Sequence, residues 1–296
     1  MDREIQTKEP AMVGSLAEEV TLLHSLPESV SKVRQLLESP YATNGEIGEI
    51  IGNDPALTAR VLQLVNRGLG GGASAIETVS GAIALVGRES LARLLAATPA
   101  IDHFPGIPPE QVNMERFWLN SVACGVIARS LAFRCRLFHT EPFFVAGLLH
   151  KLGRLVFYSY CPDRYREVLA LSENTEERLN AAELAVFGFT HAHLAAELFR
   201  RWGLPERLQV AVGCYPAPEE APSYRKSTAL IHVASALASR IEAAVNLGGA
   251  ENGDDAGFEK GAWDILNLPL YHIPKILDEG WVQTFEISDS LRSDSL

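Results

Sequence analysis

The sequence FFVAGLLHKLGRL, residues 143–155, decides the fold class of this chain. Its first seven residues are apolar or glycine, so the segment is predicted to be buried on most sides. The apolar run ends in His150 and Lys151, and Gly153 follows shortly after. Ionisable side chains at the edge of a core are costly unless a partner compensates them. This pair is therefore the first candidate for a functional site.

The overall composition is that of a soluble globular protein. Of 296 residues, 47% are hydrophobic and 21% are charged, and a chain of this length has room for two lobes. The formal net charge of -11 argues against a sequence-independent nucleic-acid binder, because such proteins need a dense basic surface. A local basic patch remains compatible with this charge.

The sequence lacks the marks of secreted and membrane proteins. Its four cysteines show no CxxC spacing, so reduced thiols are expected. No stretch approaches the roughly 18 apolar residues of a membrane span, and the charged N-terminus lacks the apolar core of a signal peptide. We therefore expect a cytoplasmic protein with no membrane partner. The cysteines are Cys124, Cys135, Cys161 and Cys214.

Apolar residues recur at helical spacing along most of the chain, and residues that favour helix starts precede them. Pro27 suits the first turn of one helix, and Thr43 is a cap candidate for the next. Asp54 with Pro55 opens a third helix, and Thr190 caps a later one. The sequence has no sustained period-two alternation of the kind that strands require. We expect an almost entirely α-helical protein.

Prolines and composition predict how the chain is divided. Four prolines between residues 99 and 109 make that stretch the best candidate linker between two helical lobes. The C-terminal part contains a segment rich in glycine and acidic residues, which is typical of a flexible loop. The expected parts are a tail at 1–19, an N-terminal helical lobe at 20–105, a helical core at 112–245, a flexible loop at 246–262, and, within 263–296, a helix over 273–285 followed by a disordered tail.

Several motifs, in this order along the chain, resemble one protein family: NDPALTARVLQLVN (53–66), FW-x-x-S (117–121), GLLH (147–150) and FGFTHAHLAAELFRRWGLP (187–205). Together they make residues 20 to 240 closely similar to the HDOD family, the HD-related output domains, which are bacterial relatives of the HD metal-dependent phosphohydrolases. The resemblance implies an all-α, two-lobed multi-helical bundle with an HD-like core and an N-terminal helical lobe. It also implies a regulatory role in bacterial signal transduction.

The resemblance also indicates where a metal site would lie. HD phosphohydrolases hold one or two divalent metals through a histidine in the first core helix, a His-Asp pair, further histidines and a late aspartate. The matching positions here are Asn120 for the first histidine, His150 and Lys151 for the His-Asp pair, His191 for a retained histidine, Cys214 and Tyr215 for a later pair, and Ser235 for the late aspartate.

Lys151 is the departure with the largest chemical consequence. An ammonium group has no lone pair to offer a metal and repels it, whereas the aspartate of an HD pair does the opposite. His150 and His191 alone would be an incomplete ligand set for a hydrolytic metal. No metal or other cofactor is therefore expected, and both histidines are interpreted as structural.

The charge reversal suggests a different use for the same position. Lys151 and Arg154, together with Lys226, are candidates for lining a degenerate pocket that binds an anion such as a nucleotide phosphate. The competing interpretation is that Lys151 reaches solvent or pairs with an acidic residue. Cys214 is interpreted as a structural thiol.

The leading hypothesis is a non-catalytic bacterial signalling module. It would act through protein–protein interaction with other signalling proteins, gated by an anionic small ligand in the degenerate HD pocket, and would not bind nucleic acid. The alternative is a metal-dependent phosphohydrolase with an unusual ligand set. A redox-linked or nucleic-acid-linked regulator is a weaker third hypothesis, and the acidic balance does not support it.

Overall fold

The computed structural model describes residues 12–69, 75–112, 114–173, 176–247 and 260–292. Within these ranges the secondary structure is helical, apart from an isolated bridge between Ser25 and Ala100. The predicted all-α fold class is confirmed. No helix in the same ranges is both long enough and apolar enough to cross a bilayer.

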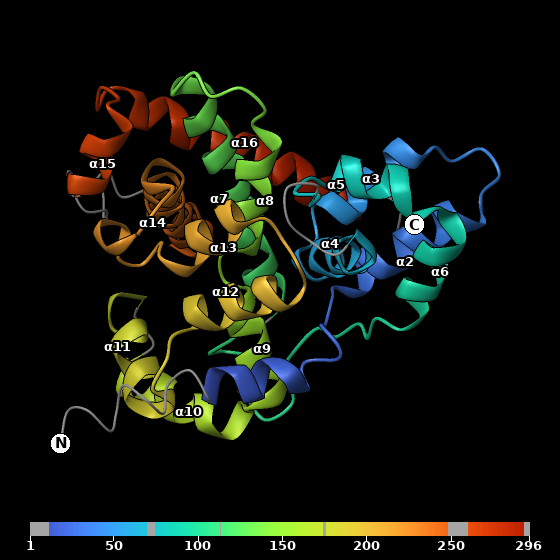
Figure 1. Cartoon of the computed structure of the whole chain (residues 1–296), viewed down its shortest axis with the longest axis horizontal. Coiled ribbons are helices and arrows are strands. Elements are labelled where there is room, and N and C mark those ends of the chain that lie inside the picture. The colour runs from blue at the N-terminus through green and yellow to red at the C-terminus, as the bar shows by residue number, and fades with distance from the viewer. Residues whose placement is uncertain (1–11, 70–74, 113, 174–175, 248–259, 293–296) are drawn as a thin grey trace.

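Five helices form the N-terminal lobe, on the right of Figure 1. Pro27 is the first residue of α2, and a capping box between Thr43 and Glu46 starts α3. The carboxylate of Asp54 accepts a hydrogen bond of 2.9 Å from the backbone N–H of Leu57 and so caps α4. These helix starts are the predicted ones. The helices are α2 (Pro27–Glu38), α3 (Asn44–Gly52), α4 (Pro55–Leu69), α5 (Val79–Val86) and α6 (Arg88–Ala96).

The second lobe is larger and is built around two long helices, α7 and α14, which pack against each other. Helices α8 and α16 also pack against α7. The predicted cap at Thr190 is present, and its backbone N–H donates to the ring of His193 at 3.3 Å. The elements are α7 (Met114–Arg134), α8 (Glu141–Leu149), α9 (Leu152–Tyr160), α10 (Pro162–Leu171), α11 (Glu176–Phe187), α12 (His191–Arg201), α13 (Glu206–Gly213), η2 (Pro218–Glu220), α14 (Arg225–Leu247), α15 (Lys260–Leu266) and α16 (His272–Arg292).

The expected tail at residues 1–19 is wrong for its second half. Residues 12–19 form a helix in which Ala17 is buried, and Val20 just after it is buried too. The segment lies on the larger lobe, where the backbone N–H groups of Thr21 and Leu22 donate to the hydroxyl of Tyr160. A short apolar stripe at positions 13, 16, 17 and 20 has the spacing of one helix face and explains the docking. Residues 1–11 lie outside the described part.

The C-terminal expectations also need correction. Helix α14 runs to Leu247 and α15 begins at Lys260, so both enter the expected loop at 246–262, and residues 248–259 lie outside the described part. Helix α16 extends to Arg292 and so includes half of the expected disordered tail. Ile276, Thr284 and Leu291 on α16 are buried, because this helix packs along α7 and reaches α2. Residues 293–296 are not described.

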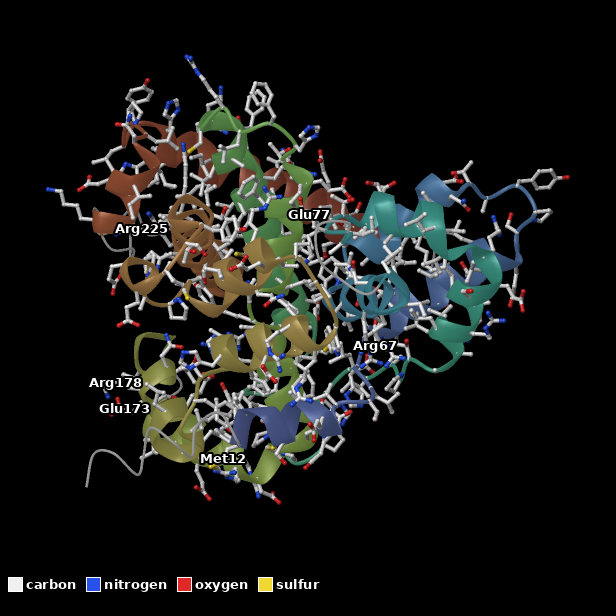
Figure 2. All side chains as sticks on the ribbon, in the orientation of Figure 1. Met12, Arg67, Glu77, Glu173, Arg178 and Arg225 are labelled. Carbon is white, nitrogen blue, oxygen red and sulfur yellow. The ribbon has the colours of Figure 1, made fainter. Side chains whose placement is uncertain are left out.

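Polar contacts join the two lobes. The backbone N–H and the hydroxyl of Ser80, in the first turn of α5, donate to the carboxylate of Glu141 at 3.1 and 2.7 Å. Glu77, which is labelled in Figure 2, forms an ion pair with Arg207 of α13. A carboxylate at a helix N-terminus is favourable because unsatisfied N–H groups and the helix dipole meet there. Glu141 therefore ties the start of α8 to the start of α5.

Two glycines of the 143–155 stretch allow helices to approach closely. A Cβ atom on Gly147 would lie 2.6 Å from the carbonyl oxygen of Cys124 in α7, and one on Gly153 would lie 2.0 Å from that of His191. No side chain fits at such distances, so these positions require glycine. The stretch thus packs α8 against α7 and α9 against the start of α12. This packing brings the candidate site together.

Candidate functional site

The His150–Lys151 pair lies at the junction of α8 and α9, inside the larger lobe. His150 ends α8, and Lys151 precedes the first residue of α9. Their side chains are buried, with Lys151 5% exposed, and Arg154 one turn further on is 3% exposed. Lys151 therefore does not extend into solvent. The sequence placed these residues at a core margin, and the structure places them in the interior.

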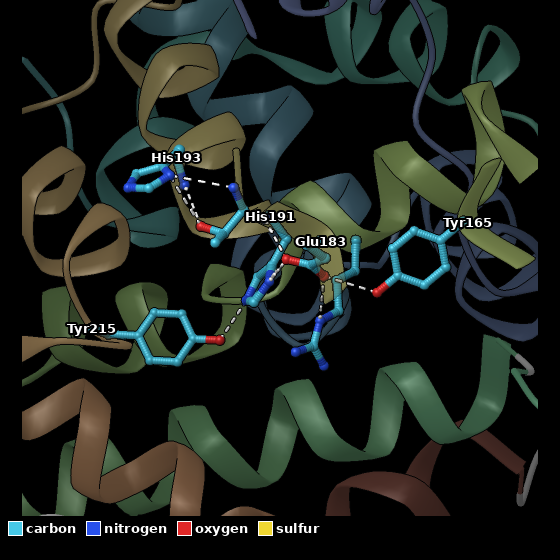
Figure 3. A network of polar contacts seen from close by, with 7 residues as sticks. Tyr165, Glu183, His191, His193 and Tyr215 are labelled. Carbon is cyan, nitrogen blue, oxygen red and sulfur yellow. Dashed lines mark hydrogen bonds and ion pairs between the residues drawn. The ribbon is translucent and has the colours of Figure 1, made fainter. Parts of the chain in front are cut away.

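Glu183 of α11 is the centre of a buried polar network (Figure 3). Its Oε2 atom lies 2.7 Å from both the backbone nitrogen and the ring Nδ1 of His191. Its Oε1 atom accepts a hydrogen bond of 2.9 Å from the hydroxyl of Tyr165 and lies 3.4 Å from Nε of Arg154. The other ring nitrogen of His191, Nε2, lies 2.6 Å from the hydroxyl of Tyr215. Both ring nitrogens of His191 are thus engaged by protein groups.

The electrostatics of Glu183 follow from these contacts. Burial alone would raise the pKa of this carboxyl, but His191 and Arg154 together hold the pKa at about 2. Glu183 is therefore ionised and can only accept hydrogen bonds, so Nδ1 of His191 must carry a proton. Burial raises the pKa of Tyr165, whose hydroxyl keeps its proton and donates to the carboxylate. The network is a carboxylate surrounded by donors.

His150 is electrically neutral in this environment. Burial, followed by the positive charge of Lys151, lowers its pKa well below the ordinary value of 6.5. Its Nδ1 atom lies 2.6 Å from the carbonyl oxygen of Gly147, which can only accept, so Nδ1 carries the single ring proton. Nε2 has no hydrogen-bond partner among the described residues. The ring instead packs edge-on against Tyr215, with ring centroids 5.2 Å apart.

The remaining predicted positions are only partly brought together. Asn120 is buried on α7, and Tyr215 reaches the network as described above. Cys214 is half-buried at the end of α13, where burial raises the pKa of its thiol. Ser235 is half-buried on α14, and its carbonyl accepts from the hydroxyl of Ser239. Neither Cys214 nor Ser235 takes part in the hydrogen bonds and ion pairs given above for the Glu183 network.

Glu183 and Tyr165 were missed by sequence reasoning. A signal for Glu183 was available, because Leu179 and Phe187 lie four residues to either side of it and are buried. A charged residue at the centre of an apolar helix stripe is a candidate for a buried ion pair. Tyr165 offers no such signal, since an aromatic residue on an apolar face is ordinary.

The residues present do not fit the divalent metal site of an HD phosphohydrolase. His191 uses both ring nitrogens within the protein, and the carboxylate of Glu183 is held by His191, Tyr165 and Arg154. Lys151 follows His150 where the family pattern has the aspartate of the His-Asp pair, and its ammonium group has no lone pair to offer a metal. Across the described ranges, no group of three or more His, Cys, Asp or Glu side chains is arranged to hold a metal ion.

The fold and this site define a class of protein: helical proteins with an HD-like core and an additional N-terminal lobe. The model of the HDOD domain matches residues 23–218. The chain belongs to the HDOD family.

Known relatives agree with this fold. The chain is similar to the MmoQ response regulator of Methylococcus capsulatus, with a TM-score of 0.71 and 22% identity over 87% of this chain and 98% of that one. It is also similar to an HDOD domain protein of unknown function from Geobacter sulfurreducens, with a TM-score of 0.52 and 22% identity over 96% and 97% of the two chains. A structure from Shewanella amazonensis named as a candidate phosphohydrolase has a TM-score of 0.52 and 20% identity over 95% and 98%.

One uncharacterised protein from Treponema pallidum is 26% identical over 205 residues. The match covers 69% of this chain and 39% of that protein. The chain therefore corresponds to about two fifths of the length of this relative.

Proposed function

We propose that this protein is a non-catalytic signal-transduction module that works in the cytoplasm through interaction with other signalling proteins. The observation that carries the proposal is that both ring nitrogens of His191 contact protein side chains. The histidine retained from the metal-binding pattern donates to Glu183 and contacts the Tyr215 hydroxyl, so binding a metal would first require breaking a buried hydrogen bond. A group held in this way serves the architecture of the core.

The charge of Lys151 supports the same conclusion. Lys151 is buried, so water screens its charge poorly. If a metal were bound at the position of the family's His-Asp pair, a cation about 4 Å away would oppose it by several kcal/mol even at an effective dielectric constant of about 20. The similarity to a response regulator, MmoQ, supports a role in signalling. The acidic net charge of -11 supports proteins over nucleic acids as the partners.

A finer part of the proposal concerns an anionic ligand. The buried cluster contains two cationic side chains, Lys151 and Arg154, and the carboxylate of Glu183. A phosphate-bearing small molecule such as a nucleotide would gate the interaction by competing with Glu183 for the guanidinium of Arg154. Isothermal titration with a nucleotide and cyclic-dinucleotide panel tests this part, with Lys151→Met as a variant of similar volume. If no nucleotide binds at millimolar concentration, the anionic-ligand part of the proposal is refuted.

The alternative function is a metal-dependent phosphohydrolase with an unusual ligand set, and its specific support is the free lone pair on His150 Nε2. Elemental analysis of the purified full chain separates the two. We expect substoichiometric iron, manganese, zinc and nickel, and no hydrolysis of bis(p-nitrophenyl) phosphate with any of these metals added. A stoichiometric metal, or metal-dependent hydrolysis that is lost in His150→Ala, would overturn the proposal in favour of the enzyme.

A further inference from the structure

A long groove runs along α16 on the outside of the molecule. One hollow, of about 680 Å³, lies between α16 and the outer face of α7. A second hollow, of about 1010 Å³, lies where α16 meets α3 and α5 of the N-terminal lobe. Both hollows have Arg129, Thr140 and Gln283 in their walls, so they adjoin along α16 and are separated by these residues. We call the two hollows together the α16 groove, and it extends from Tyr271 to Ile287.

Large apolar side chains are exposed at the α7 end of the groove. Phe133, at the end of α7, is 73% exposed, and Tyr271, at the start of α16, is 74% exposed. Both line the groove. Phe138, in the loop that follows α7, is also exposed, and the neighbouring Arg136 and His139 have positive φ angles of 56° and 59°. Non-glycine residues adopt this conformation at a cost, so the loop that presents Phe138 is strained.

The two ends of the groove carry opposite charge. At the α7 end, Arg134 and Lys275 both form ion pairs with Glu279, at 2.7 and 4.0 Å, so two cations face one carboxylate and the excess charge is positive. At the lobe junction, the walls contain Glu49, Glu141 and Glu286. Arg129 marks the boundary, where its guanidinium donates to Gln283 at 3.0 Å and lies 5.1 Å from the ring centroid of Phe144.

The floor between the charged ends is apolar. Val126 and Phe144 are buried beneath it, and Ile83 and Ile287 continue it toward the N-terminal lobe. The sixteen residue steps from Tyr271 to Ile287 correspond to a helix length of about 24 Å. The groove therefore has the length, the apolar floor and the polarised rim that suit one amphipathic helix of about 16 residues.

We propose that the α16 groove binds an amphipathic helical segment of a partner signalling protein. The segment would place acidic side chains at the Phe133 and Lys275 end and basic side chains at the Glu49 and Glu286 end. This inference rests on the proposed function and adds to it the surface and the chemistry of the partner. A bound segment would contact both lobes, because the groove crosses their junction at Ser80 and Glu141.

A protein segment fits these observations better than a membrane surface. The depression is concave, and its acidic end together with the net charge of -11 would be repelled by anionic lipid headgroups. A polarised groove also discriminates between partners through charge order, which a lipid surface does not offer.

Three synthetic 16-residue peptides test the proposal on the full chain. All share one apolar stripe and one composition: the first carries glutamates in its N-terminal half and lysines in its C-terminal half, the second the reverse order, and the third alternating charges. Fluorescence anisotropy at low salt gives Kd. We expect one of the two segregated peptides to bind about tenfold more tightly than the alternating peptide. Only a segregated charge order places acidic side chains at the cationic end of the groove and basic side chains at its acidic end. Equal Kd values for all three would overturn the proposal.

Two variants in the groove and one control complete the test. Phe133→Ser is expected to weaken binding about tenfold, as the loss of an exposed aromatic anchor does. Lys275→Glu is expected to weaken it about threefold, since its side chain is 73% exposed. Arg166→Glu on α10, at the opposite side of the molecule in Figure 1, should leave Kd unchanged. Unchanged Kd values in both groove variants would refute the assignment.

Two further measurements identify a different occupant. Co-sedimentation with phosphatidylglycerol vesicles that Phe133→Ser abolishes would replace the peptide by a membrane surface. A dimer in sedimentation velocity that the same substitution dissociates would replace it by a second copy of this chain. Each result would overturn the groove assignment without touching the proposed function, which the metal and hydrolysis measurements decide.

Discussion

Replacing Glu183 by glutamine should destabilise the fold through loss of one buried charge. Glutamine keeps the shape of the side chain and one acceptor oxygen, so no cavity forms. The buried guanidinium of Arg154 then loses the negative charge that lies 3.4 Å from its Nε atom. Removing one partner of a buried ion pair costs about 3–5 kcal/mol in general, because the other charge stays buried without compensation.

The pKa of Glu183 gives an independent magnitude. A pKa of about 2 in the folded state, against an ordinary value of 4.5, corresponds to about 3 kcal/mol of stabilisation at pH 7. Because the folded pKa is the lower one, this stabilisation is complete above pH 4.5 and is lost as the pH falls toward 2. About half of it should remain at pH 3.

Urea unfolding followed by tryptophan fluorescence measures the free energy of unfolding of wild type and Glu183→Gln. We expect a difference of about 3 kcal/mol at pH 7 and about half of that at pH 3, once circular dichroism has established that both proteins are folded there. Glu197→Gln is the matched control on α12. Its ion pairs with Arg200 and Arg201 are near the surface, so the change should stay below about 1 kcal/mol. A Glu183→Gln penalty that is equal at both pH values would refute the electrostatic reasoning.

Three further predictions follow from contacts of single residues. Gly153→Ala should destabilise the fold by about 3 kcal/mol in urea unfolding, because its Cβ would lie 2.0 Å from a backbone oxygen of α12. Gly68→Ala is the control: with nothing within 4 Å of its Cβ, it should stabilise the fold by about 0.5 kcal/mol. Similar changes in the free energy of unfolding for both variants would contradict the close packing of Gly153 against α12. Arg88→Met should lower the thermal midpoint by several degrees, since the guanidinium donates to carbonyl groups at the end of α2, whereas Arg93→Met at an exposed pair should leave the midpoint in place. Long-range ¹H–¹⁵N spectra at pH 6 should show His150 neutral with its proton on Nδ1, and an imidazolium at that pH would disprove its burial beside a cation.

The sequence by itself determined the helices and the family. Pro27, Thr43, Asp54 and Thr190 start helices through contacts within three or four residues, so local rules are sufficient to place them. Terminal helices were the exception. The helix over residues 12–19 and the end of α16 depend on docking against distant parts of the chain.

The tertiary structure decided what surrounds the retained histidines. From the sequence, Lys151 was expected at a core margin, where it would either reach solvent or pair with an acidic residue. The structure buries it. It also brings Glu183 of α11 and Tyr215 of the turn after α13 onto the two ring nitrogens of His191. Hydrogen-bond partners separated by 8 and 24 residues are selected by helix packing, and no local pattern specifies them.

The α16 groove is also a feature that only the tertiary structure decides. Its walls come from segments as far apart as Glu49, Arg129 and Glu286, so its polarised charge exists only once the lobes are packed. In the linear sequence these residues are ordinary surface charges on separate helices. A chain determines its helices through neighbours a turn away, while sites and surfaces require contacts across the fold.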